Sequence, residues 1–119
     1  MSTAVKRKLS GSTDGMPIKV VATATAGTTI HTAVAGTTAG TFDEIWLYAY
    51  NGHTTAVTLT IEYGGATVPD QNIVITLPSK SGLNLIVPGL ILQNGLVVKA
   101  FASVANVITI SGYVNSITD

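Results

Sequence analysis

Apolar and polar residues alternate along most of this chain, and the alternation predicts a succession of short β-strands. Residues 57–63 show it most clearly, because Val57, Leu59 and Ile61 are separated by threonines. Successive side chains of a strand point to opposite faces of a sheet, so this segment would turn one face to a core and the other to solvent. The same reasoning predicts about eight strands, at residues 18–26, 28–35, 42–50, 57–63, 73–77, 83–87, 96–103 and 107–115.

Turn residues separate these segments. Asn51-Gly52 is the strongest hairpin signal, because a type I′ turn requires positive φ at both central residues and Asn-Gly adopts it readily. We therefore expect residues 42–50 and 57–63 to pair as a hairpin. Further turns are expected at Pro88-Gly89, Asn94-Gly95 and Ala105-Asn106. Short strands joined by turns, with no helical period, predict an all-β fold: a single antiparallel β-sandwich of jelly-roll or immunoglobulin-like topology.

The N-terminal segment differs from the rest of the chain. Residues 1–17 are small, polar and basic, and they show no sustained period. We predict an extended basic N-terminal arm at residues 1–17, either mobile or ordered by a neighbour, followed by one β-sandwich domain at residues 18–119. Lys6, Arg7 and Lys8 are candidate contacts of this arm with a partner. A solvated tail is the alternative reading of three adjacent cations.

The composition favours association. Only 10% of the residues are charged and 46% are hydrophobic, whereas about 25% of an ordinary soluble domain is charged. Charge is what usually keeps a β-protein monomeric, so we expect an oligomer or a permanent partner. The formal net charge is zero, which predicts neither a nucleic-acid nor a membrane partner. With no apolar run long enough for a signal peptide or a membrane span, the chain is expected to be soluble and made in the cytosol.

The sequence offers few groups for catalysis or metal binding. There is no cysteine, and neither His31 nor His53 has a carboxylate or a second histidine within five residues. Asp43 and Glu44 are adjacent on a predicted strand, so their side chains would point to opposite faces and could not flank one bond. No phosphate-binding loop or nucleophile elbow occurs. We therefore expect no catalytic residue, no metal, no cofactor and no enzymatic activity.

Three aromatic residues occupy alternate positions in the predicted strand at residues 42–50. Trp46, Tyr48 and Tyr50 lie two residues apart and would share one face of a strand. Such a stripe can stack on sugar rings or on bases. Because the basic neighbours of a nucleic-acid site are missing, we favour packing or a subunit interface, and we name these residues candidate interface aromatics.

Three segments carry a family resemblance: KVVATATAGTTIHTAVAGTT, FDEIWLYAYNGHTTAVTLTIEYGG and LIVPGLILQNGLVVKAFASVANVITISGYVNSI. Together they resemble small virion structural proteins of tailed bacteriophages, cyanophage-like ones in particular, and among these the capsid decoration or cement proteins. The resemblance implies a β-rich homo-oligomer, often a trimer, that binds the major capsid protein on the capsid exterior and clamps the shell. It carries no functional residues over. A tail, head-fibre or connector protein, and a carbohydrate-binding module using the three aromatics, are the alternatives.

Overall fold

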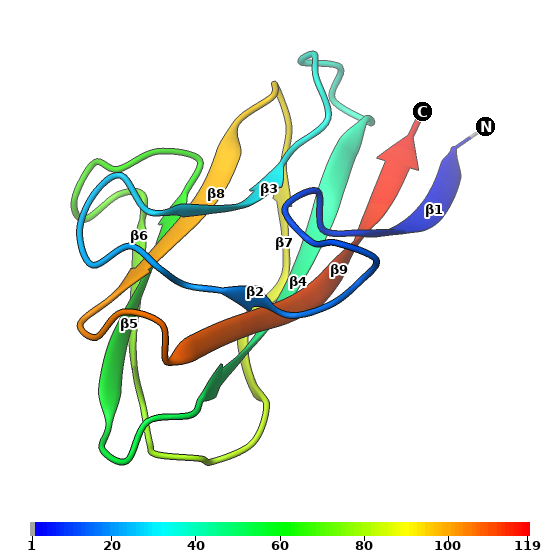
Figure 1. Ribbon diagram of the computed structural model, residues 1–119. Coiled ribbons are helices and arrows are strands. Elements are labelled where there is room, and N and C mark those ends of the chain that lie inside the picture. Colours follow the sequence, from blue (N-terminus) through cyan, green and yellow to red (C-terminus); the bar gives the residue numbers. More distant parts are fainter. Residues whose placement is uncertain (1) are drawn as a thin grey trace.

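The computed structural model describes residues 2–119, and within them nine strands form two antiparallel sheets without a helix (Figure 1). The first sheet has the order β1-β9-β4-β7, and β2 also pairs with β9. The second sheet has the order β3-β8-β5-β6. The strands are β1 (Thr3–Lys8), β2 (Ile18–Lys19), β3 (Thr28–Thr32), β4 (Phe42–Asn51), β5 (Val57–Tyr63), β6 (Asn72–Leu77), β7 (Asn84–Leu92), β8 (Val97–Ala102) and β9 (Ile108–Thr118). The predicted all-β antiparallel sandwich is confirmed.

The strands pair in a nested order, the first with the last. β1 and β2 pair with β9, β3 with β8, β4 with β7 and β5 with β6, all antiparallel. Nesting of this kind results when one long hairpin is folded over on itself, and it produces the two facing sheets of a jelly roll. Of the two topologies that the sequence left open, the strand order is therefore that of the jelly roll.

The core lies between the two sheets and takes every second residue of the central strands. Ile45, Leu47 and Ala49 of β4 are completely buried, and so are Leu59 and Ile61 of β5. This is the two-residue period that the sequence predicted. The alternate residues of β4, among them Glu44, Trp46, Tyr48 and Tyr50, are partly exposed and point away from the core, which defines the outer face of the first sheet.

The hairpin predicted at Asn51-Gly52 is wrong. β4 pairs with β7 and β9, whereas β5 pairs with β6 and β8, so the segment between β4 and β5 crosses from one sheet to the other. Asn51 is fully buried and its side-chain amide donates to the carbonyl oxygens of Thr55 at 3.0 Å and Leu77 at 2.9 Å. The side chain of Asn51 thus anchors the loop that crosses between the two sheets. Positive φ at both residues of an Asn-Gly pair is found instead at Asn94 and Gly95.

The turn predicted at Pro88-Gly89 is also wrong, because β7 continues through it to Leu92. The pairing of β4 with β7 shifts register twice in this region, between Ile45 and Trp46 and between Leu47 and Tyr48. Such irregularities let a strand keep pairing past a proline, and β7 is an edge strand that tolerates one. The result is one long edge strand where the sequence predicted a short strand and a turn.

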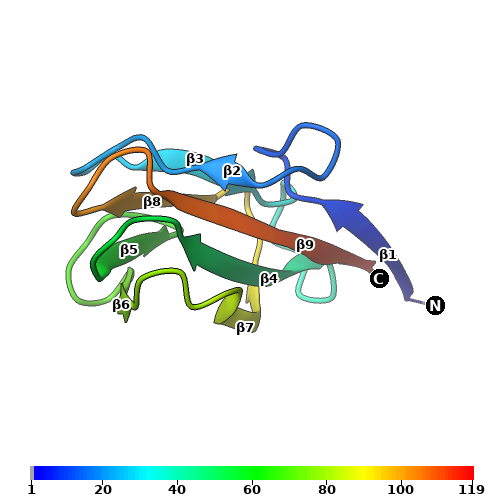
Figure 2. The same ribbon diagram turned by 60° about the horizontal axis from the view of Figure 1, so that its bottom comes forward.

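The extended N-terminal arm is not confirmed. Met1 lies outside the described residues, and residues 3–8 form β1, which runs antiparallel to the end of β9 near the C-terminus (Figure 2). All six residues of β1 are exposed, but Leu9 directly after it is only 1% exposed and belongs to the core. The burial of Leu9, backbone pairing to a long last strand and hydrogen bonds to β3 therefore hold a segment whose own apolar content is low.

Candidate interaction face

The outer face of the first sheet carries a cluster of aromatic rings. Trp46, Tyr48 and Tyr50 alternate with the buried residues of β4, so all three point away from the core and are partly exposed. A fourth ring, Tyr113 of β9, lies directly opposite Trp46 in the register. The two rings stack with centroids 6.2 Å apart and planes 15° apart. We call these four residues the aromatic face. The sequence reasoning missed Tyr113, because nothing in the sequence showed that β9 pairs with β4.

Polar contacts fix the orientation of Trp46. Its indole nitrogen donates to Glu44 Oε1 at 2.8 Å, and the Asn115 side chain donates to the same oxygen at 3.0 Å. These two hydrogen bonds lower the pKa of Glu44, and the one from Asn115 has the larger effect. On the neighbouring strand, a Cβ at Gly89 would lie 2.8 Å from the indole ring, so only glycine leaves room for the ring there. Trp46 is therefore held in place before any partner binds.

Aliphatic side chains extend this face towards the sheet edge. Leu85 pairs with Tyr48 and Ile91 with Glu44, so both lie beside the outward residues of β4. Leu85 is 47% exposed and Ile91 is 56% exposed. No charged residue occurs between Lys80 and Lys99. An apolar area of this kind on an edge strand is typical of a protein–protein contact.

The three cations of β1 do not lie together. Lys6 is on the outer face, with its ammonium 4.3 Å from the centre of the Tyr113 ring. Arg7 pairs with Val114, which is completely buried, so Arg7 points to the inner side of the first sheet. Lys8 donates from its Nζ to the Ser12 carbonyl oxygen at 3.1 Å. A partner could therefore contact Lys6 and Arg7 only from opposite sides of the strand.

A buried polar cluster joins the two sheets next to β1. His31 of β3 and Asp43 of β4 are 5% and 3% exposed, and His31 Nε2 lies 2.7 Å from Asp43 Oδ2. The backbone N–H of Ser10 donates to His31 Nδ1 at 3.0 Å, so Nδ1 is the acceptor and Nε2 carries the proton that Asp43 accepts. Asp43 also accepts from Val34 N at 3.2 Å and from Ser116 Oγ at 2.8 Å.

This cluster could not be predicted from the sequence, because the histidine and the carboxylate are twelve residues apart and lie in different sheets. In a serine hydrolase the histidine keeps one ring nitrogen for the nucleophile. Here Nδ1 is occupied by a backbone N–H and Nε2 by Asp43. The arrangement ties together β3, β4, β9 and the segment after β1. Glu44, by contrast, lies on the outer face, so the predicted separation of Asp43 and Glu44 is confirmed.

His53 lies in the loop between β4 and β5 and is partly exposed. Its backbone N–H donates to Asn51 Oδ1 at 2.8 Å. Within residues 2–119, no three side chains of His, Asp or Glu are grouped so that they could hold a metal ion.

Tyr63 carries a buried hydroxyl without a hydrogen-bond partner in residues 2–119. Burial, and secondly the charge of Asp43, raise the pKa of Tyr63 far above its ordinary value. The folded protein therefore requires the neutral phenol.

The Tyr63→Phe substitution is expected to raise the free energy of unfolding, by up to about 1 kcal/mol, because it removes an unpaired buried hydroxyl. The pH dependence has a defined sign. Above about pH 10 the tyrosine ionises in the unfolded chain but not in the folded one, so wild-type stability falls as the pH rises. In the Tyr63→Phe variant, this part of the decrease of the free energy of unfolding with rising pH should be absent. Urea unfolding at neutral and alkaline pH measures both effects, and a destabilised variant at neutral pH would contradict the assignment.

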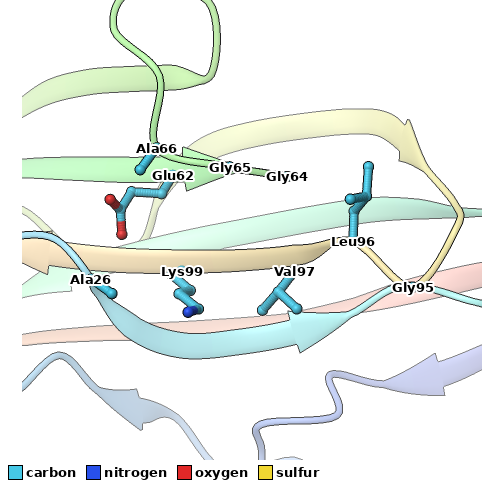
Figure 3. Close-up of a pocket in the computed structure, with 9 residues that line it drawn as sticks. All are labelled: Ala26, Glu62, Gly64, Gly65, Ala66, Gly95, Leu96, Val97 and Lys99. Carbon is cyan, nitrogen blue, oxygen red and sulfur yellow. The ribbon is translucent and has the colours of Figure 1, made fainter.

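A hollow of 330 Å³ lies on the outer side of the second sheet, lined by Gly64, Glu62 and Lys99 among others (Figure 3). Glu62 was expected on a solvent face but is only 2% exposed. Its carboxylate accepts from Gly27 N at 2.7 Å and from Thr25 Oγ1 at 2.9 Å. The glutamate therefore fastens the loop before β3 over the outer face of the sheet.

Comparisons with protein-family models, with curated proteins and with solved structures give no match for this chain. The described residues contain no helix with the length and apolar character needed to span a membrane.

Proposed function

We propose that this chain is a virion structural protein of a tailed bacteriophage, which binds the outer capsid surface as a decoration or cement protein. The observation that carries the proposal is the outer face of the first sheet, where Trp46, Tyr48, Tyr50 and Tyr113 adjoin exposed aliphatic residues of an edge strand. The protein acts as a homo-oligomer, a trimer, and bridges subunits of the major capsid protein.

The physical character of this face supports a permanent protein partner. Tyrosine and tryptophan are enriched at interfaces, and obligate interfaces are more apolar than transient ones. The Trp46 ring is already oriented by Glu44 and Tyr113, so little side-chain freedom is lost on binding. Jelly rolls are common among capsid and lectin domains, although a fold alone does not determine a function.

A structural role without catalysis or cofactor is part of the proposal. The two nitrogens of His31 are both engaged in hydrogen bonds that hold the fold. The protein would be made in the host cytoplasm and would reside on the capsid exterior, with neither nucleic acid nor membrane as its partner.

A second candidate function is a carbohydrate-binding module, because three rings of β4 share one partly exposed face. Sugar rings stack on such aromatics. This candidate predicts glycan binding by the purified protein, with affinity that falls when Trp46, Tyr48 or Tyr50 is changed to alanine. A glycan array with these variants decides for or against it.

The capsid proposal is tested by adding the purified protein to particles that lack it. We expect binding to saturate at a copy number stoichiometric with the capsid lattice, and the loaded particles to withstand higher temperatures. Quantitative gel analysis and a thermal release assay of the packaged DNA measure the two effects. Attachment at a few copies away from the shell would indicate a tail, head-fibre or connector protein instead and would contradict the proposal.

A further inference from the structure

A hollow of 510 Å³ lies beside β1, between β1 and β3. It is lined by cations and hydroxyl groups, including Arg7, Lys8, Ser10, Thr32 and Thr118. The volume falls within the usual range of small-ligand sites, about 300 to 1,000 Å³. It is large enough for a side chain rather than a single ion.

Arg7 is the principal charge of this hollow. Its position opposite Val114 turns it to the inner side of the first sheet. Within residues 2–119 the one contact of salt-bridge distance joins His31 and Asp43, so no carboxylate lies within 4.0 Å of the Arg7 guanidinium there. Its guanidinium offers a planar fork of donors that matches a carboxylate.

Asp43 is the single anion in the wall, and its oxygens are already used. Oδ1 accepts from Ser116, and Oδ2 accepts from His31 and Val34. Lys8 also lines the hollow, but it pairs with the outward-facing Tyr113 and its Nζ donates to the Ser12 carbonyl oxygen, so the positive charge available in the hollow is that of Arg7. The hydroxyl oxygen of Ser10 accepts from Thr32 N at 2.7 Å, so its own hydrogen remains available to donate.

We propose that this hollow binds a carboxylate side chain of an acidic protein segment. The Arg7 guanidinium would donate to both carboxylate oxygens, and the Ser10 hydroxyl would be an additional donor. The guanidinium of Arg7, which has no carboxylate partner within residues 2–119, matches a singly charged carboxylate. Inorganic phosphate can also accept hydrogen bonds from a guanidinium, so it is the competing ligand in the test. The site rests on its own geometry, whereas the assignment of the segment to a capsid partner rests on the function proposed above.

The neighbouring Lys6 supplies a matched control. It has the same charge and lies on the same strand, but it faces the other way, over Tyr113. Removing either cation changes the net charge equally, so only a site with a defined geometry distinguishes them.

The test is an NMR titration of the full chain with a triglutamate peptide that has blocked ends, with the triglutamine peptide as the neutral reference. We expect saturable shifts of the amides of Ser10, Thr32 and Thr118. Arg7→Ala should weaken binding about tenfold or more, as loss of a charge-assisted hydrogen bond does, while Lys6→Ala should have almost no effect. Arg7→Lys should fall between wild type and Arg7→Ala. Unchanged thermal melting verifies that each variant is folded.

Three results would overturn the site: no saturable binding of triglutamate, an equal loss in the Lys6 and Arg7 variants, or tighter binding of inorganic phosphate than of the peptide. The equal loss would indicate a diffuse attraction to a basic strand. The tighter phosphate binding would indicate a phosphate site. Peptide binding is measured without particles, so its failure is distinguishable from a failure to attach to capsids.

Discussion

Replacing Asp43 by alanine is expected to lower the free energy of unfolding by about 3 kcal/mol, because a donor left unsatisfied in the interior costs about 1 to 3 kcal/mol. The carboxylate is 3% exposed and accepts three hydrogen bonds, from His31, Val34 and Ser116. Its removal leaves one buried donor, that of His31, and two partly buried donors, those of Val34 and Ser116, without their acceptor, and an unsatisfied donor is costly in a low-dielectric interior. The donors come from both sheets, so the substitution also removes a link across the sandwich. Urea unfolding followed by tryptophan fluorescence or circular dichroism measures the loss.

Glu44→Ala is the matched control for this prediction. Glu44 adjoins Asp43 and carries the same charge, but it lies on the outer face, where water replaces the hydrogen bonds from Trp46 and Asn115. Its effect on stability should be much smaller. Equal losses in the two variants would show that the polar cluster adds nothing beyond the net charge.

Placing a lysine at Tyr48 is expected to weaken self-association about 30-fold or more, the effect of removing a strong interface residue. Tyr48 is the central ring of the β4 stripe and pairs with Leu85 on one side and Ser111 on the other. In a packed apolar interface the new ammonium would be buried without a partner, which costs more than the lost ring contacts alone. Sedimentation equilibrium of wild type and variant gives the two dissociation constants.

Thr76→Lys tests whether the effect belongs to this face. Thr76 is exposed on the outer face of the second sheet, so the substitution adds the same charge to the opposite side of the sandwich. It should leave self-association almost unchanged. If both lysines dissociate the oligomer equally, general charge repulsion accounts for the result and the aromatic face does not.

The alternation of apolar and polar residues was sufficient to predict the fold class and most strands. Period-two patterns in β4 and β5 reflect burial on one side, which is a local property of the sequence. The connections could not be predicted in this way. Asn51-Gly52 has the composition of a tight hairpin, yet the buried side chain of Asn51 fastens a loop that crosses between sheets. Whether a turn stays within one sheet depends on pairing between distant strands.

The candidate site was predicted in part. The common outward direction of Trp46, Tyr48 and Tyr50 follows from strand alternation and is observed. Tyr113 joins them only through the register of β9 against β4, which the sequence does not specify. The His31–Asp43 pair and the division of Lys6 from Arg7 between two faces likewise depend on which strands become neighbours.

The central claim is that the outer face of the first sheet is covered by protein in the functional state, first by other copies of this chain. Sedimentation velocity of the purified wild-type chain across a wide range of concentrations tests it most directly. We predict a discrete oligomer, with a trimer as the expected stoichiometry. A single monomeric species at every concentration would contradict the claim.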